Sequence, residues 1–384
     1  SLFISYIGKS IKDGKPHPPS TAIQTLIDHT PGLKARIVDE KLHAFDPLYF
    51  DAASPRSHAR DLLEAARTLT AQGGKDKPHL HISLDGQQEE EKASISIDAF
   101  VRWFTKTADQ FLRLGLQAKR RYLDEPMNEN EPLAIDPLAA WRMKAATLDH
   151  HPDMEDQIQA WRQEGMVPAG ELGERAVKSQ LEGLDEFLAD LPETKPLEIS
   201  VTVDGLTIHG NIPVAQIDNQ ETVFVAESSS PSAPRQLTTW IYSLLASTQA
   251  GTSVPAQLCG TKKNGANKLV PSVFLFNPPG EQEALLIDLV RLYRAAQRSP
   301  LPHFPKTAEA YLGVNPKNNE DEEALEGRRR TSALKAWESS DYSTGESEDD
   351  AVQLLFDTSE PFSDEFFAIT ETIWEPLITH RLKR

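Results

Sequence analysis

The chain has 384 residues, of which 39% are hydrophobic and 26% charged, so it is long enough for two or three domains with their own cores and is not wholly disordered. Its 40 Lys and Arg against 58 Asp and Glu give a net charge of -18, which excludes the basic surface of a free-standing nucleic-acid binder. The single cysteine, Cys259, excludes a disulfide framework and indicates a reducing compartment, the cytoplasm by default.

The first 75 residues predict a small unit that opens with alternating apolar and polar residues. This pattern is typical of a strand over residues 2–7, and helices are expected over 20–28, with Ser20 as N-cap, and over 58–70. The first residue, Ser1, is neither an initiator Met nor part of a signal peptide, so we expect a piece of a longer protein. The Gly-, Pro- and Glu-rich stretch 76–95 predicts a linker.

Residues 96–384 are predicted to form one domain that begins with helices. Apolar residues at helical spacing indicate a core-facing helix over 98–116, with Asp98 as N-cap. We favour this interpretation over a helix that docks into a partner's groove, because apolar stripes usually pack against their own core. Further helices are expected over three segments, 137–148, 154–165 and 171–191.

The segment after residue 191 predicts an α-β-β-β-α-β core of a mixed α/β fold. Asp204-Gly205 is a strong hairpin turn between the first two strands. The expected elements are strands at 197–203, 206–214, 222–227, 256–259 and 272–276, and helices at 236–246 and 281–298. The C-terminal tail is predicted to be helical around two acidic, mobile loops, 315–331 and 338–350.

This order of elements is that of restriction-endonuclease-like nucleases, whose metal site needs an Asp on the second strand and an acid-x-Lys motif on the third. Here Pro213 stands at the first position, and Glu227 and Ser229 stand at the other two. We therefore predict a nuclease fold without catalysis, with no catalytic residue and no metal. The alternative is a Mg²⁺-dependent DNA nuclease that uses Glu227 with a rearranged acid, Asp204 or Asp218.

Basic residues cluster in one place, the turn formed by Lys262, Lys263 and Lys268. We predict that this turn contacts a phosphate backbone, although the ends of charged hairpins are usually only solvated. For Arg328-Arg329-Arg330, pairing with the surrounding Glu320–Glu326 is the simpler interpretation.

Four other motifs are weaker, and no cofactor is predicted from them. Gly8-Lys9-Ser10 lacks the first glycine of a P-loop, because Phe3 stands there. Two histidine pairs have too few ligands for a metal, and Cys259 is expected to be a small buried hydrophobe. These pairs are His79 with His81, and His150 with His151.

Several stretches in order and at the right spacing resemble one family, the gamma subunits of exodeoxyribonuclease V, which are the RecC subunits of the RecBCD helicase-nuclease. The resemblance covers most of residues 1–312. Its stretches are 2–11, 19–20, 43–50, 100–104, 165–173, 293–294 and 300–308.

The resemblance implies that residues 1–75 end a degenerate helicase-like domain and that a degenerate nuclease-like domain follows. It further implies RecB-like and RecD-like partner subunits in a hetero-trimer. The DNA substrates would be double-stranded ends and the separated single strands, handled during double-strand break repair by homologous recombination. A free-standing DNA-binding regulator is disfavoured by the net charge of -18.

Overall fold

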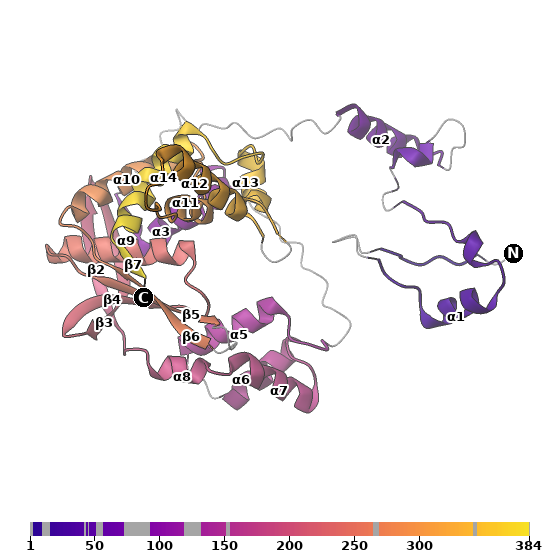
Figure 1. Ribbon diagram of the computed structural model, residues 1–384, viewed down its shortest axis with the longest axis horizontal. Coiled ribbons are helices and arrows are strands. Elements are labelled where there is room, and N and C mark those ends of the chain that lie inside the picture. The colour runs from indigo at the N-terminus through magenta and orange to yellow at the C-terminus, as the bar shows by residue number, and fades with distance from the viewer. Residues whose placement is uncertain are drawn as a thin grey trace. The chain divides into compact units, whose positions relative to one another are not determined.

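A computed structural model describes residues 3–9, 16–41, 44, 46–50, 57–72, 93–118, 132–150, 154–263, 269–340 and 344–383 (Figure 1). The chain divides into two compact units, 1–77 and 78–384. Among the described residues, no helix is both long enough and apolar enough to cross a membrane.

The first unit contains short helices and little core. Its elements are α1 (Thr21–His29), η1 (Lys34–Arg36), η2 (Pro47–Phe50) and α2 (Arg60–Gln72). The strand expected over 2–7 is wrong for its described part, because residues 3–8 have no pairing partner and only a bridge between Lys9 and Pro16 forms. Ser20 precedes α1 as expected, but its side chain makes no capping hydrogen bond. Ala66 is the one buried apolar side chain among the described residues of this unit.

The second unit is built on a seven-stranded mixed sheet. Its strands are β1 (Ser94–Ser96), β2 (Lys195–Val203), β3 (Leu206–Ile217), β4 (Gln220–Ala226), β5 (Ala256–Lys263), β6 (Leu269–Phe276) and β7 (Arg381–Lys383). The strand order is β1-β3-β4-β5-β6-β7, and β2 pairs with β3. The pairs β1–β3 and β4–β5 are parallel and the others antiparallel.

The predicted α-β-β-β-α-β order is present, formed by α8 (Leu184–Ala189), β2, β3, β4, α9 (Ala233–Ala250) and β5. Asp204 and Gly205 form the predicted turn, with φ of 47° and 76°, and join Val203 to Leu206. These positive φ values suit a tight hairpin, where Asp and Gly are favoured. Arg294 reinforces the turn: its Nη1 donates to Asp204 Oδ2 at 2.6 Å and its Nη2 to the Asp204 carbonyl at 2.7 Å.

The middle of β3 lacks a neighbour on one side, and this gap positions the site described below. On that side β3 pairs with β1 at residues 207–209 and with β4 at 214–217. Between these two contacts lies the stretch 210–213, which begins at Gly210 with a φ of 146° that suits glycine alone. After Val223, β4 turns away from β3 and continues beside β5.

Helices cover both faces of the sheet (Figure 1). Neighbouring residues of β4, Val223 and Phe224, belong to different cores because successive side chains of a strand point to opposite faces. The smaller core lies under α5 (Pro137–His150), α6 (Met154–Gln163), α7 (Gly170–Leu181) and α8. The larger core includes α3 (Ile97–Thr105), α9, α10 (Gln282–Arg298), α11 (Pro305–Leu312), α12 (Glu322–Trp337), α13 (Asp350–Leu355) and α14 (Asp364–Thr379).

Two predicted helices are interrupted. The helix expected over 98–116 is three segments: α3, α4 (Thr107–Gln110) and the π-helical η3 (Phe111–Gly115). Its N-cap is Ser96 and not Asp98, because the Ser96 hydroxyl accepts a hydrogen bond from the Ala99 N–H at 3.3 Å. The helix expected over 171–191 breaks at Gly183, whose φ of 80° is left-handed.

The acidic loop expected over 315–331 is wrong in its second half, where α12 begins at Glu322. Asp321 caps this helix by accepting a hydrogen bond from the Ala324 N–H at 2.7 Å. Glu322 and Glu323 lie in its first turn, where negative charge stabilises the helix dipole, so this acidic run favours a helix. The second loop also contains a short helical turn, η4 (Glu346–Glu348).

Candidate functional site

Pro213 lies on β3 in the stretch without a neighbour on the β4 side. It pairs in register with Pro196 of β2. Two opposed prolines have no N–H between them, so this position requires no ladder hydrogen bond from either residue. Pro213 also brings no side-chain oxygen to the place where a metal-dependent nuclease needs an acid.

Glu227 follows β4 directly, and its carboxylate is used as a local anchor. Its main-chain N–H donates to the Cys259 carbonyl at 2.8 Å. Its Oε2 accepts from the Ser232 N–H at 3.2 Å, and its Oε1 from the Ser232 hydroxyl at 3.3 Å. Ser232 is the N-cap residue of α9, so Glu227 places negative charge at the positive end of that helix.

The segment between Glu227 and α9 is fixed to β5. Thr261 donates from its N–H to the Ser229 carbonyl and from its hydroxyl to the Ser228 carbonyl, both at 2.9 Å. A Cβ at Gly260 would come within 2.4 Å of the Ser229 carbonyl oxygen, so only glycine allows this close approach. Ser229 is held by its main chain, and its side chain lies near enough to the Glu227 carboxylate to lower the pKa of that group.

The electrostatics of this region involve four side chains. Burial raises the pKa of Glu227, while the hydrogen bonds from Ser232 and the charge of Arg235 oppose that rise. Burial and the charge of Asp98 raise the pKa of Tyr242, and Arg235 opposes it. Arg235 thus lies near enough to influence both Glu227 and Tyr242, and Asp98 lies near enough to influence Tyr242. Arg235 places a positive charge beside a carboxylate in the region where a nuclease would hold its metal.

The two acids of the alternative nuclease hypothesis lie at the ends of β3, away from Glu227. Asp218 is in the β3–β4 turn, seven strand residues from Glu227, which corresponds to about 20 Å. Asp204 is in the β2–β3 turn and accepts a hydrogen bond from Arg294. Its distance along β3 from the part of that strand nearest Glu227 is also about 20 Å. No group of three His, Cys, Asp or Glu side chains suited to a metal occurs among the residues described.

The predicted basic turn joins β5 to β6. Lys262 is exposed and pairs in register with Val270, and Lys263 pairs with Leu269. Lys268 and the rest of the turn lie outside the described residues. The structure therefore provides the hairpin that carries these lysines.

The structure describes one of the four weaker motifs fully and one of them in part. Cys259 is buried as predicted, and burial raises the pKa of its thiol to about 11. Gly8 and Lys9 lie in the first unit, in a stretch to which the structure assigns no helix. Ser10, His79, His81 and His151 lie outside the described residues, as does the side chain of His150.

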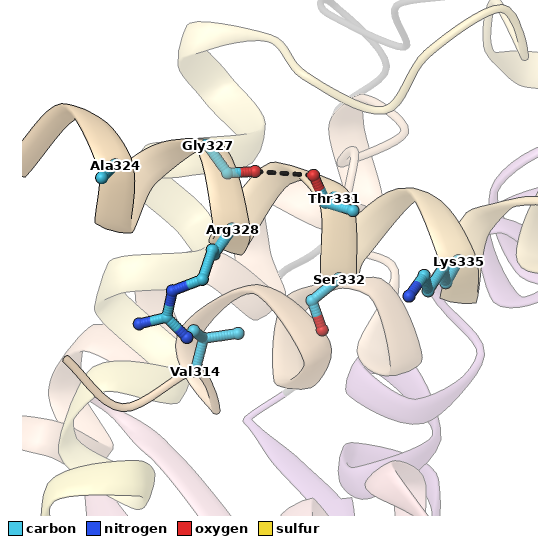
Figure 2. Close-up of a pocket in the computed structure, with 7 residues that line it drawn as sticks. All are labelled: Val314, Ala324, Gly327, Arg328, Thr331, Ser332 and Lys335. Carbon is cyan, nitrogen blue, oxygen red and sulfur yellow. Dashed lines mark hydrogen bonds between the residues drawn. The ribbon is translucent and has the colours of Figure 1, made fainter. Parts of the chain in front are cut away.

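The three arginines of α12 are held within the protein, as the simpler interpretation predicted. Arg328 Nε donates to Glu320 at 2.6 Å, and Arg330 Nε donates to Glu326 at 2.7 Å. Arg329 lies over the ring of Tyr311. Figure 2 shows Arg328 beside a shallow groove along α12, formed with Val314, Ala324, Gly327, Thr331, Ser332 and Lys335. No carboxylate lines this groove, and none of the predicted site residues does.

Sequence reasoning missed three members of the site region and one buried polar pair. Asp98 was interpreted only as a cap, and Arg235 and Tyr242 only as parts of the stretch 235–242, which resembles the helix that follows the active lysine in restriction-endonuclease-like nucleases. The buried pair is His303 and Trp374: the indole Nε1 donates to His303 Nε2 at 3.0 Å. In the sequence, the extended segment of His303 with its flanking prolines was the one indication of this buried pair, because such a segment is typical of a connector packed inside a fold.

The fold and the site define a mixed α/β domain with an α-β-β-β-α-β core, in which Pro213 lies on β3 and Glu227 and Ser229 follow β4. The model of one family, described as the RecC C-terminal domain, matches residues 92–314. The chain belongs to this family.

Curated relatives agree with this assignment. The RecBCD enzyme subunit RecC of Escherichia coli is 26% identical over 391 residues, which cover 92% of this chain and 33% of that protein. The RecC subunit of Mycobacterium tuberculosis is also 26% identical, over 81% of this chain and 29% of that protein. The chain thus spans about a third of the length of these relatives.

Solved structures are more distant. Two of them, one from Eubacterium rectale, each overlap 55% of this chain. The overlaps cover 82% and 94% of those chains, with 10% and 14% identity and TM-scores of 0.33 and 0.23. Likenesses at this distance carry no functional information.

Proposed function

We propose that this chain is a non-catalytic, DNA-handling part of a RecBCD-type enzyme that acts in double-strand break repair by homologous recombination. In this proposal residues 1–75 end a helicase-like domain, and the second unit is a degenerate nuclease domain. Its partners are a RecB-like and a RecD-like subunit. Its nucleic-acid ligands are double-stranded DNA ends and the strands separated from them.

The observation that carries the non-catalytic part is the use of Glu227. A carboxylate that prepares a metal for phosphodiester cleavage must converge with a second acid and leave its oxygens available. Glu227 instead accepts two hydrogen bonds from Ser232, and Arg235 provides the nearby positive charge. The two other acids considered, Asp204 and Asp218, lie about 20 Å away along the strands.

A cleavage assay on the purified chain tests this proposal. Linear duplex and single-stranded DNA are incubated with Mg²⁺ or Mn²⁺ and with EDTA, and products are resolved at nucleotide level. The proposal predicts no cleavage above the EDTA control. Cleavage that needs the divalent ion and disappears in Glu227→Ala would establish the alternative, a nuclease that uses Glu227.

The DNA-handling part rests on the β5–β6 hairpin, where Lys262 is exposed. The lysines of this hairpin lie close together in the sequence of a chain of net charge -18, and a subunit of a larger enzyme needs only a local positive strip to guide a phosphate backbone. Because phosphate contacts release counterions, loss of two lysines should weaken binding across all sequences and lower its salt dependence.

The matching experiment measures binding of duplex ends by the assembled enzyme over a series of salt concentrations. The double variant Lys262→Ala with Lys263→Ala should bind more weakly and show a logarithmic salt slope smaller in magnitude by about 1–2. The control is Lys178→Ala, an exposed lysine on α7. Equal effects of both variants would mean that the hairpin does not contact DNA.

A further inference from the structure

The groove along α12 is lined by hydrogen-bond donors and by no carboxylate, on a chain whose net charge is -18. Its volume is about 560 Å³. Thr331, Ser332 and Lys335 follow Arg328 by three, four and seven residues, so the four polar side chains share one face of the helix. Figure 2 shows Arg328, Ser332 and Lys335 on the same side of α12. Two cations and two hydroxyls in one groove are suited to an anion with several oxygens.

Arg328 is fixed by acceptors that do not line the groove. The Glu320 carboxylate accepts from its Nε at 2.6 Å and from its Nη2, and the Asn315 carbonyl accepts from Nη2 at 2.9 Å. In the described part of the chain nothing accepts from Nη1, so this nitrogen is a donor held in a set orientation. Because Glu320 offsets much of the charge of Arg328, Lys335 is the main positive charge of the groove.

Lys335 and Ser332 have their donors available. Lys335 is exposed and Ser332 half-buried, and neither side chain bonds an acceptor among the residues that the structure describes. Glu326 of the same helix does not serve as such an acceptor, because its oxygens accept from Tyr311 at 2.6 Å and from Arg330 at 2.7 Å. The acids near the groove are therefore used elsewhere, and its donors face solvent.

The length of the groove fits a short stretch of one DNA strand. Seven helical residues separate Arg328 from Lys335, which corresponds to about 10 Å along the helix axis. One strand of B-DNA rises by about 3.4 Å per phosphate, so this length spans about three nucleotides. Ser332 lies between the two cations, and serine hydroxyls are common partners of phosphate oxygens.

We infer that the α12 groove binds the phosphate backbone of one strand of a DNA end, with Lys335 as its charged donor and Ser332 and Arg328 Nη1 as its neutral and oriented donors. This inference rests on the proposed function, since it takes DNA to be a ligand of the assembled enzyme. It adds a site apart from the β5–β6 hairpin, because α12 begins after residues 92–314, which match the family model.

Protection of lysines in the assembled enzyme tests the site directly. Lysines are acylated with an amine reagent with and without a duplex end, and the rate at each lysine is measured by mass spectrometry. Bound phosphate should slow the modification of Lys335 by about threefold or more. Lys178, exposed on α7, should react at the same rate in both samples. An unprotected Lys335 in an enzyme that binds the duplex would overturn the inference.

Variants then show whether the contact contributes to affinity. Lys335→Ala should weaken binding of duplex ends about threefold and reduce the magnitude of the logarithmic salt slope by about 1, because one phosphate contact is lost. Lys335→Arg, which keeps the charge, should bind as the parent does. The matched control is Lys178→Ala, which removes the same charge from another exposed helix.

The possible failures are distinguishable. If Lys335→Ala and Lys178→Ala bind DNA equally well, the groove inference is wrong and the proposed function stands. If Lys335→Ala loses a partner subunit and keeps its affinity for DNA, the groove binds protein, and the inference is again wrong. A parent enzyme without affinity for DNA ends would contradict the proposed function as well.

Discussion

At the scale of single residues, Glu227 shows how a carboxylate at the end of a strand can serve the fold. Burial raises the pKa of Glu227 above the usual value, although the hydrogen bonds from Ser232 oppose the rise. Ionising this carboxyl group in the folded protein therefore lowers the free energy of unfolding. Its contribution to stability is therefore greatest at low pH and is lost as pH rises through the pKa in the folded state.

Glu227→Gln should accordingly leave the fold intact and be neutral or stabilising at pH 7, by at most about 1 kcal/mol, because the amide oxygen still accepts from Ser232. The difference in the free energy of unfolding between Glu227→Gln and the parent chain should grow, in favour of the variant, between pH 4.5 and pH 7. Thermal unfolding over this range measures the effect, with Glu193→Gln, an exposed position, as the control. A strong loss of stability at pH 7 would contradict this account of Glu227.

His303 gives a second prediction, with the opposite dependence on pH. Burial lowers its pKa to about 4, and its Nε2 accepts from Trp374, so the folded protein holds a neutral imidazole. The unfolded chain binds a proton near the ordinary value of about 6.5, so stability is full above that pH and is lost as pH falls toward 4.

The expected slope is as much as about 1.4 kcal/mol per pH unit within this window. Urea unfolding at several pH values measures it. In His303→Gln the slope should flatten, because the amide can still accept from Trp374 but does not titrate. The control His209→Gln, at an exposed position of β3, should keep the slope of the parent chain. Identical slopes in both variants would show that His303 does not govern this transition.

Some of these residues could be predicted from the sequence and others could not. Pro213, Glu227 and Ser229 were identifiable because they stand at fixed places in a strand pattern. The partners of Ser229 were not, because Thr261 and Gly260 come from β5, more than 30 residues away. Asp98 and Ser96 are both good N-caps, and only the φ of Ser96 and its bond to Ala99 decide between them.

At the scale of elements, Glu346 caps a helix that lies 40 residues earlier in the chain. Its Oε1 accepts from the Lys306 N–H at 3.1 Å, and its Oε2 accepts from the N–H and the hydroxyl of Thr307, both at 2.8 Å. The two N–H donors are free groups at the start of α11, and the hydroxyl adds a third hydrogen bond. The acidic stretch after α12 therefore holds a helix in place.

Glu346→Ala should lower the free energy of unfolding by about 1–2 kcal/mol, because it leaves the first N–H groups of α11 without their acceptor. Chemical denaturation measures this loss. Glu348→Ala, two residues away and exposed, should change stability by less than about 0.5 kcal/mol. Equal losses in the two variants would mean that general charge, and not the cap, is responsible.

The elements themselves were predictable where their periodicity is long and uniform. The strands from 195 to 226, the Asp204-Gly205 turn and α10 follow the sequence pattern closely. The helix breaks at Lys106 and Gly183 could not be predicted, because the spacing of apolar residues continues across each break. The start of α12 was missed because a run of acidic residues is typical both of a loop and of a helix N-terminus. In the structure Asp321 caps the helix, which favours the second interpretation.

At the scale of the whole molecule, the sheet of the second unit carries a separate core on each face, and residues 210–213 of β3 lie in the gap between β1 and β4. The sequence predicted the mixed α/β class and the α-β-β-β-α-β order. The sequence could not predict that β4 leaves β3 after Val223. From this residue on β4 pairs with β5, and α9 separates these two strands in the sequence. That departure decides where Glu227 lies.

The most direct test of the central claim is a crystal structure of the chain soaked in Mn²⁺, with anomalous scattering measured around Pro213, Glu227 and Ser229. The account predicts no ion at this position, with Glu227 still bonded to Ser232. An ion bound by Glu227 and a second carboxylate, Asp98 included, would contradict it and identify the chain as a metal-dependent enzyme.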